Sequence, residues 1–491
     1  MGCCGGATRP GADDDHIGCY RCLGDSGIPV VSHQHPCRSL GTRDSLGGFA
    51  PHGILRHRRK EAVQRGSWRC GVNLATVIQR FQGRRLRART VELDAALDLT
   101  SYVNATGTAW LRHGSGMVGW GEVARFRGGI AEAESWWLQV AAEIDAETEM
   151  EASPGSGPLA FGSFVFDPYN TTHESVMVVP QIVLGQRSGR TWMTSLTFDD
   201  EPWPQMPDPA GPVLAPDATT VAATSLDRSG WSRIVAEAVT RIRGGEVEKV
   251  VLARAEQIRA ANRLDPRYLV EALSRSYDSC WTFQVDSLVG ASPEMLVRCE
   301  KGLATSRVLA GTIRAQGDQQ ADLRLAQVLS ASSKNLIEHE LAVASVAEAL
   351  APFCSGMNVP VAPYVLELPN VLHLASDVTA VARPGVTALR LAAELHPSAA
   401  VCGTPTEAAR AMIAELEGLD RGRYSGPVGW VDTAGDGEFA IALRSGWLHP
   451  DDPHCISIYA GCGIVAESEP SEEYAETVAK LLPMHQALGL D

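Results

Sequence analysis

Charged residues in the second half of the chain occur inside segments that are otherwise apolar and typical of buried strands and helices. Burying a Lys or Glu is costly unless the charge is paired or takes part in chemistry. Such segments therefore constrain the fold to one that gathers acid, base and carboxylate groups into a shared site. The four segments with this feature are KVVLAR at 249–254, GASPE at 290–294, KNLIEHE at 334–340 and GCGIVAESEPSEEYAETVAK at 461–480. Together they predict an enzyme with an acid/base site and a carboxylate-bound metal.

Strands and helices are expected to be mixed along the chain. Apolar segments punctuated by Gly predict strands, and apolar spacings of three and four predict helices. Because these elements do not alternate in a regular strand–helix–strand order, we predict an α+β fold. The expected strands are 117–126, 157–168, 176–186, 191–198 and 248–258, the expected helices are 231–243 (ended by Gly244 and Gly245) and 321–350, and a Pro-rich connector spans 197–220.

The charge distribution excludes nucleic acid as a partner of the main fold. The 491-residue chain has a net charge of −15, although residues 1–90 contain 15 Lys and Arg against 6 Asp and Glu. The rest of the chain is therefore strongly acidic, whereas phosphate binding needs clustered basic residues. No apolar run reaches the roughly 18–20 residues that span a bilayer, so we expect no membrane partner.

Residues 1–90 differ from the rest of the chain because they are rich in Gly, Arg, Cys and His and lack periodicity. We interpret them as a disordered extension or as sequence added by a mis-called start. An Arg-rich targeting segment is an alternative, and a zinc site is another, although one CxxC pair is a weak signal. The candidate zinc ligands are Cys19, Cys22, His33, His35 and Cys37.

Beyond residue 90 we predict two regions of a main fold. Residues 91–222 form its N-terminal part with the Pro-rich connector, and residues 223–491 carry the four charged segments. The later cysteines, from Cys280 to Cys462, lie mostly in apolar runs where Cys acts as a small hydrophobe. With no recognisable signal peptide, this usage predicts a reducing cytoplasm.

Lys249 and Glu294 are the candidate acid/base pair. Lys249 opens a β-branched strand, and Glu294 follows Pro293 after an apolar run. If buried, the Lys becomes available as a general base and the Glu as a general acid, since burial disfavours both charges. The alternatives are a Lys that extends its ammonium to solvent at a strand end and an ordinary turn acid.

Three further glutamates are candidate metal ligands. Glu338 lies mid-helix between apolar neighbours, and Glu473, Glu476 and Lys480 share one face of a terminal helix. Carboxylate oxygens suit Mg²⁺, which typically takes one or two of them with water and substrate. The alternative is a helix-stabilising Glu476–Lys480 ion pair.

Nine motifs follow one another in the order typical of a known family. The chain from about residue 91 onward resembles the chorismate-utilising enzymes, which include anthranilate, aminodeoxychorismate, salicylate and isochorismate synthases. WGEVARF and AFGSFVFDP upstream are similar to isochorismate synthases of the menaquinone pathway. The resemblance implies two large antiparallel sheets packed face to face, helices outside them, and a site in a cleft between. The nine motifs are KVVLAR, GASPEMLVR, LAGTIRA, KNLIEHEL, LPNVLHLASD, HPSAAVCGTP, YSGPVGW, FAIALRSG and YAGCGIVAESEP.

The resemblance also implies a role for each charged residue. Lys249 is similar to the base that activates water for attack at C2 of chorismate, and Glu294 to the acid that protonates the departing C4 hydroxyl. Glu338 and Glu476 resemble Mg²⁺ ligands, with Glu473 a third that acts through water. The implied substrate positions are Gly311, Thr312 and His373 along the ring, Tyr424 beside the enolpyruvyl carboxylate, Ala400, and Arg444, Lys480, Gly461 and Gly463 as anion contacts.

The nucleophile implied by the resemblance is water. Family members that use ammonia usually have Gln in place of Lys249, and Ala310 replaces the Lys that the aminodeoxychorismate type can carry. Salicylate synthases tend to have Thr at Ala400, so Ala favours a reaction that stops at isochorismate. Ser398 and Cys462 depart from the commoner Thr and Ala by small-for-small exchanges.

These residues together predict a Mg²⁺-dependent isochorismate synthase that converts chorismate reversibly, for menaquinone biosynthesis. The alternatives are a salicylate synthase, which would go on to eliminate pyruvate, and an isochorismate synthase of a siderophore pathway. A non-enzymatic protein, with residues 1–90 as a zinc or nucleic-acid module on an inactive fold, is a third. We expect chorismate as the small-molecule partner, no glutaminase subunit, and a monomer.

Overall fold

A computed structural model describes residues 84–151 and 153–490 of the chain. These described residues belong to one compact unit. The candidate zinc ligands between Cys19 and Cys37 lie outside the described residues. None of the described helices is long and apolar enough to cross a membrane.

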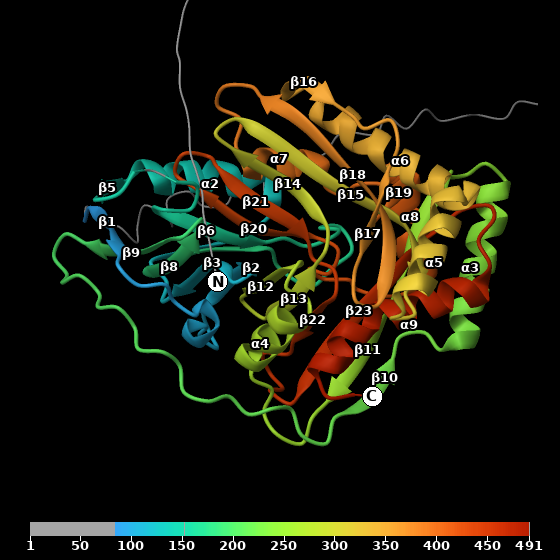
Figure 1. The fold of residues 1–491 in the computed structure, drawn as a ribbon, viewed down its shortest axis with the longest axis horizontal. Helices are drawn as coiled ribbons and strands as arrows, with labels where there is room; N and C mark the ends of the chain where they lie inside the picture. The colour runs from blue at the N-terminus through green and yellow to red at the C-terminus, as the bar shows by residue number, and fades with distance from the viewer. Residues whose placement is uncertain (1–83, 152, 491) are drawn as a thin grey trace, which may run out of the picture. The chain divides into compact units, whose positions relative to one another are not determined.

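The larger sheet has thirteen strands and joins segments that are far apart in the sequence (Figure 1). β11 is paired antiparallel to β23 along almost its whole length, and β1 and β5 form a parallel pair at the far edge. In order across the sheet the strands are β10 (Thr220–Thr224), β11 (Lys249–Arg259), β23 (Cys455–Ile464), β22 (Ser445–Leu448), β13 (Leu288–Ser292), β12 (Trp281–Val285), β2 (Thr108–Arg112), β3 (Ser115–Trp120), β8 (Ile182–Arg187), β9 (Arg190–Phe198), β1 (Leu86–Leu93) and β5 (Ile144–Thr148), and β19 (Gly403–Thr404) pairs with β11.

The smaller sheet has ten strands, and its pairs in the described residues are all antiparallel. The predicted pair of large antiparallel sheets is therefore confirmed, apart from the parallel β1–β5 contact of the larger sheet. In order, the strands are β16 (Cys354–Asn358), β18 (Val371–Ala382), β15 (Leu303–Arg314), β14 (Met295–Glu300), β21 (Gly437–Ile441), β20 (Pro427–Asp432), β6 (Leu159–Ser163), β7 (Val176–Val179) and β4 (Ala124–Arg127), with β17 (Tyr364–Glu367) on β18.

A buried aromatic cluster holds the two sheets face to face. Trp110 and Phe283 of the larger sheet pack in one cluster with Phe161 and Trp430 of the smaller sheet. The Trp110 indole Nε1–H also donates to Glu438 Oε2 across the layers at 2.8 Å. Since burial of large aromatic side chains is a main source of folding free energy, this cluster fixes the relative position of the sheets that frame the site.

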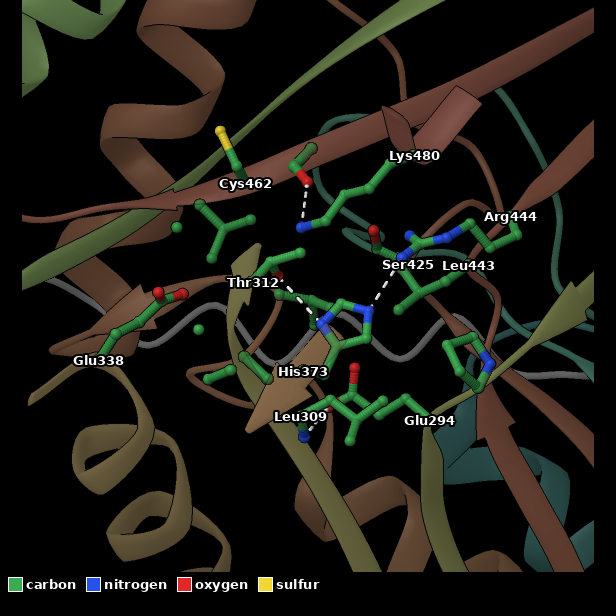
Figure 2. A pocket seen from close by; sticks show the side chains of 18 of the residues that line it. Glu294, Leu309, Thr312, Glu338, His373, Ser425, Leu443, Arg444, Cys462 and Lys480 are labelled. Atoms are coloured by element: carbon green, nitrogen blue, oxygen red, sulfur yellow. Dashed lines mark hydrogen bonds between the residues drawn. The ribbon is translucent and has the colours of Figure 1, made fainter. Parts of the chain in front are cut away.

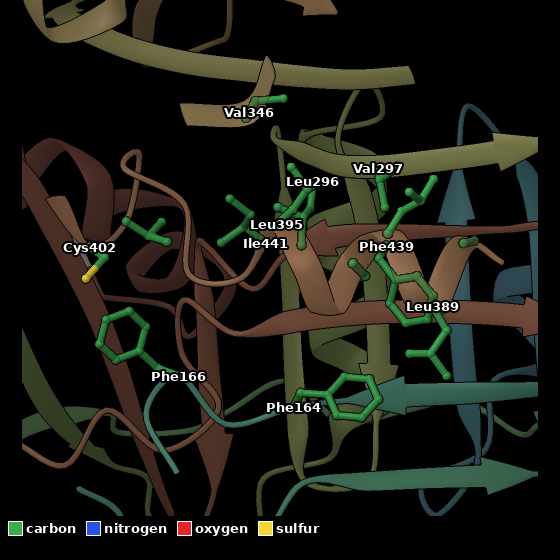
Figure 3. Close-up of a cluster of buried hydrophobic side chains, with 14 of the residues drawn as sticks. Phe164, Phe166, Leu296, Val297, Val346, Leu389, Leu395, Cys402, Phe439 and Ile441 are labelled. Atoms are coloured by element: carbon green, nitrogen blue, oxygen red, sulfur yellow. The ribbon is translucent and has the colours of Figure 1, made fainter. Parts of the chain in front are cut away.

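The helices cover the outer faces of the sheets. In Figure 3, Leu389 and Leu395 of α7 lie near Phe439 and Ile441 of β21, and all four belong to one buried cluster. A second cluster includes buried residues of α4 and α9 with strands of the larger sheet. The helices are α2 (Ile130–Ala142), α3 (Arg228–Arg243), α4 (Pro266–Ser276), α5 (Gln319–Ala331), α6 (Ser333–Leu350), α7 (Ala388–Leu395), α8 (Thr406–Glu417) and α9 (Pro470–Ala487), with a 3₁₀ helix at Leu99–Tyr102.

One predicted helix is wrong in its extent. The single helix expected over 321–350 is divided into α5 and α6 at Ser332, whose backbone is extended and whose hydroxyl accepts a hydrogen bond from the backbone N–H of Asn335. Serine competes for backbone hydrogen bonds in this way at helix starts, so the Ser332 side chain begins a new helix instead of continuing the old one.

Two expected strands are also wrong in their extent, because 117–126 is divided into β3 and β4 and 176–186 into β7 and β8, each time between the two sheets. The breaks contain Gly121, with a φ of +66°, and Pro180, which has no N–H for a strand ladder.

The expected strands that contain β6, β9 and β11 and the helix α3 lie where predicted. The helix α3 ends at Gly244 and Gly245, and Gly245 takes a φ of +81° that favours glycine. The connector between β9 and β10 has no regular secondary structure over 199–219. β1 crosses the predicted boundary at residue 90, so the regular structure begins a few residues earlier than that boundary.

Candidate active site

A pocket gathers most of the predicted site residues from segments that are distant in sequence. Strand β15, helices α6 and α9, strand β23 and the loops after β13 and β21 all contribute to its lining (Figure 2). Its enclosed volume is about 40 Å³, which is room for a few waters. The predicted residues that line the pocket are Glu294, Gly311, Thr312, Glu338, His373, Ala400, Tyr424, Arg444, Gly461, Gly463 and Lys480.

Lys249 lies just behind this lining and is completely buried at the start of β11. The alternative of a solvent-exposed strand-end lysine is therefore wrong. Its Nζ lies 3.2 Å from Glu338 Oε1 and has no hydrogen-bond partner among the described residues. Gly463 on the neighbouring strand makes this approach possible, because a Cβ there would lie 2.1 Å from Glu338 Oε1 and 2.9 Å from Lys249 Cε.

Glu294 is a buried carboxyl in the turn that joins β13 to β14. The alternative of an ordinary turn acid is therefore wrong as well. Burial raises the pKa of Glu294 to about 7, although the Leu309 backbone N–H, which donates to Oε1 at 3.3 Å, and the Lys249 charge oppose the rise. A carboxyl with a pKa near 7 can hold and release a proton at neutral pH.

His373 on β18 lies between two polar partners at the centre of the pocket view (Figure 2). Thr312 Oγ1 is 3.0 Å from its Nδ1, and an Arg444 guanidinium nitrogen is 3.3 Å from its Nε2. Because a guanidinium only donates, Nε2 accepts and Nδ1–H donates to Thr312. Burial and the charges of Arg444 and Lys480 lower the pKa of His373, so the ring is a neutral imidazole.

Gly311 allows this side of the pocket to form. It has a φ of +83°, and the β15–β18 register shifts between Leu309 and Thr312. A Cβ at Gly311 would also lie 2.9 Å from Asn335 Cβ of α6. The LAGT segment is therefore a glycine bulge that aims Thr312 at the imidazole while the preceding backbone holds Glu294.

Each of the three predicted metal carboxylates has a lysine partner. Glu338 Oε1 lies 3.2 Å from Lys249 Nζ, and Glu476 Oε1 lies 2.6 Å from Lys480 Nζ. Glu473 Oε1 accepts a hydrogen bond of 2.6 Å from Lys334 Nζ. Within the described residues, no three or more His, Cys, Asp or Glu side chains converge as a metal centre, so the three glutamates stay a predicted ligand set.

Burial and mutual repulsion act on two of these carboxylates. Burial raises the pKa of Glu473, and the neighbouring Glu476 raises it further, while Lys334 opposes the rise. Lys480 is held by Glu476 and donates to the Gly461 carbonyl at 3.0 Å. The Glu476–Lys480 ion pair expected as an alternative is thus present, and it lies at the pocket lining.

A buried ion pair supports the wall of the pocket beside β11. On one edge, β11 pairs with β19 at its start and with β10 at its end. Between these two partners, the Val251 carbonyl and the Ala253 N–H have no strand among the described residues to bond to on this edge. Arg421 donates to Val251 O at 2.7 Å, and Glu417 accepts from Ala253 N at 2.7 Å. Arg421 also donates to the carbonyl of Val401, a lining residue, at 3.0 Å.

A sequence profile described as "Chorismate binding enzyme" matches residues 108–489. The match covers more than half of the chain and includes every residue of the pocket. The chain belongs to the chorismate-binding enzyme family.

Two relatives and one solved structure show how this family member compares with known proteins. The chain is 40% identical to the "Salicylate biosynthesis isochorismate synthase" of Pseudomonas aeruginosa over 291 residues. This aligned part spans 58% of this chain and 60% of that protein. It is 30% identical to "Isochorismate synthase MenF" of Bacillus subtilis over 381 residues, and the aligned part spans 72% of this chain and 80% of that protein. The menaquinone-specific isochorismate synthase of Escherichia coli has the same fold, with a TM-score of 0.69, 23% identity, and coverage of 84% and 99%.

The pocket of this chorismate-binding enzyme contains residues that the motifs did not single out. Leu309 supplies a backbone donor to Glu294, and Ser425 and Leu443 line the pocket. Lys334 lies outside the lining and pairs with Glu473. Lys334 belongs to the KNLIEHE segment, at the start of the helix that carries Glu338. This position in the sequence was the signal that could have identified it as a residue near the site.

Proposed function

We propose that this protein is an isochorismate synthase. The observation that carries the proposal is that Glu294, a buried carboxyl with a pKa near 7, lines a pocket and that the fully buried Lys249 lies just behind the lining of the same pocket. A buried amine and a carboxyl that can hold a proton at neutral pH suit a reaction that removes one proton and supplies another. The names of the relatives support the same reaction class.

In the proposed reaction, water adds at C2 of chorismate while the C4 hydroxyl leaves as water and the ring double bonds shift. Lys249 takes a proton from the attacking water, and Glu294 gives its proton to the departing hydroxyl. The two groups exchange roles in the reverse direction, which makes the conversion reversible. The Leu309 N–H holds the Glu294 carboxyl in place for this transfer.

The predicted ligand set fits Mg²⁺ by its donor chemistry. All three groups are carboxylates, and Glu476 is close enough to Glu473 to raise its pKa, which supports a site that takes a cation. Glu338 and Glu476 would hold the ion directly, and Glu473 through water. When bound, the ion would supply positive charge for the ring carboxylate of the substrate.

The remaining pocket residues would position the substrate. Arg444 and Lys480 are buried cations at the lining, suited to carboxylate binding. Gly461 and Gly463 bring the backbone close, while Gly311, Thr312 and the neutral His373 would lie along the ring. Tyr424, stacked on Tyr459 with ring centroids 5.0 Å apart, would flank the enolpyruvyl carboxylate, and Ala400 would leave space beside it.

We infer water as the nucleophile, and therefore no glutaminase subunit, from Lys249 and from Ala310 in the lining. The menaquinone pathway is inferred from the upstream segments WGEVARF and AFGSFVFDP, part of which forms β4 and β6. We further propose that the enzyme is a cytoplasmic monomer and that the part of residues 1–90 that precedes β1 is an extension outside its catalytic fold.

The test is a product analysis with purified protein, chorismate and Mg²⁺, followed by chromatography with a parallel pyruvate assay. Isochorismate without pyruvate, lost on addition of EDTA, is the expected result. Salicylate with equimolar pyruvate would move the protein to the salicylate synthases. Absence of any product from chorismate would overturn the proposal.

A further inference from the structure

Lys334 lies at the junction of the two helices that carry the predicted metal carboxylates. It is in the first turn of α6, four residues before Glu338, and its Nζ crosses to Glu473 Oε1 of α9 at 2.6 Å. The Lys334 side chain is 24% exposed, whereas that of Glu473 is 2% exposed. The ammonium therefore reaches inward from the surface to a carboxylate that solvent barely touches.

A buried carboxylate beside another carboxylate requires a cation close by. Glu473 has Glu476 as its neighbour, and the charge that faces it is the Lys334 ammonium. Lys334 Nζ lies 2.6 Å from Glu473 Oε1, which is the distance of a direct ion pair. The geometry thus places a side-chain cation on a carboxylate predicted to serve a metal ion.

Lys334 differs from the other two lysines of the site in the exposure of its side chain to solvent. Lys249 is completely buried on a strand, and the Lys480 side chain is 13% exposed and also donates to the Gly461 carbonyl. Lys334 has the most exposed side chain of the three and lies outside the pocket lining. A partly exposed lysine can turn its ammonium to water more readily than a buried one.

We propose that Lys334 is a displaceable counter-cation: it neutralises Glu473 in the metal-free enzyme and withdraws to solvent when Mg²⁺ binds. The inference rests on the proposed Mg²⁺ site. Metal binding then has to break the Lys334–Glu473 ion pair, so the lysine weakens Mg²⁺ affinity while it stabilises the metal-free fold. Lys334 is a positioning residue for the carboxylate and touches no substrate.

The experiment compares the wild type with Lys334→Gln, Lys334→Arg and Lys301→Gln, each full length and made metal-free with EDTA. Lys301 is an exposed lysine on the β14–β15 turn that does not line this pocket, so its variant controls for net charge. Calorimetric titration with MgCl₂ measures affinity, and thermal unfolding with and without MgCl₂ measures Tm.

Lys334→Gln is expected to bind Mg²⁺ about tenfold more tightly, because a positive charge near the ion is removed. Its metal-free Tm should fall, and saturating MgCl₂ should restore it to the wild-type value. Lys334→Arg and Lys301→Gln should titrate like the wild type. A merely structural lysine would instead lower Tm with and without metal and leave affinity unchanged or weaker.

Wild-type affinity in Lys334→Gln, or equal tightening in Lys301→Gln, would overturn the role of Lys334 and leave the proposed function standing. A wild type that binds no Mg²⁺ but still makes isochorismate would instead overturn the proposed metal site, and this inference with it.

Discussion

At the scale of single residues, burial defines the surroundings of Lys249 and Glu294, the proposed acid/base pair. Both side chains are removed from water, one on a strand and one in a tight turn. We expect Lys249→Ala and Glu294→Gln each to reduce turnover by about 10²–10⁴-fold or more, as for loss of a general base or acid. Steady-state assays with chorismate check this, and Lys301→Ala serves as an exposed-lysine control.

Mg²⁺ binding should survive in both variants, since neither residue belongs to the predicted ligand set. Calorimetric titration with MgCl₂ checks this point separately from activity. Near-normal turnover in either variant would contradict the acid/base assignment.

The raised pKa of Glu294 has a consequence for stability. A carboxyl with a folded-state pKa of about 7, above the ordinary value of 4.5, favours the folded state below pH 4.5, and this contribution is lost as pH rises through 7. Glu294→Gln removes the titration, so its stability relative to the wild type should rise by about 3 kcal/mol between these pH values.

Urea unfolding of both proteins at pH 4.5, 6 and 8 measures this difference. A difference in unfolding free energy that stays constant over this range would show that Glu294 does not titrate there. The same pKa predicts that turnover falls above pH 7, where the general acid loses its proton.

At the scale of elements, two side chains bond backbone groups of β11 where none of the described strands does so. Glu417 and Arg421 take up the backbone groups of β11 that lie between β19 and β10. They are themselves a buried ion pair, which costs much to break because the partner is left as an uncompensated charge. This pair holds the strand on which Lys249 is placed.

We therefore expect Arg421→Met to lower the free energy of unfolding by about 3–5 kcal/mol. The double variant Glu417→Leu/Arg421→Met should recover part of that loss, because it removes both charges. Guanidinium unfolding checks the order of the three proteins. A single variant as stable as the wild type would show that the pair does not support β11.

The division of α5 from α6 is also decided at this scale. Apolar spacing continues across 321–350, so periodicity alone predicts one helix. The Ser332 hydroxyl bonds the Asn335 N–H and begins α6 there. The sequence contains this cap as Ser-Ser-Lys-Asn, but two adjacent serines in a helical pattern do not reveal which of them leaves the helix.

At the scale of the whole molecule, the catalytic fold needs strands from both halves of the chain. β2, β3, β8 and β9 from the first half continue the sheet that contains β11 and β23. Because the first of the described strands, β1, begins at Leu86, we expect deletion of residues 1–83 to leave kcat and KM for chorismate within about twofold of the full chain. Steady-state kinetics check this, and a tenfold loss would assign the deleted residues a part in catalysis.

Local patterns and motif order were sufficient to predict the α+β class, the strands β6, β9 and β11, the helices α3 and α9, and many of the residues that line the pocket. They succeed because alternation, helical spacing and glycine at tight turns are properties of neighbouring residues. The family motifs carry the site residues in their order, which the family match over 108–489 supports.

Only the tertiary structure decided how charges face one another. Lys249 is buried against Glu338 because Gly463 of a strand two hundred residues away has no side chain there. Lys334 meets Glu473 because α6 and α9 lie beside the same pocket. Burial and ion pairing depend on distances between segments remote in sequence, and such distances are set by packing of the two sheets and their helices.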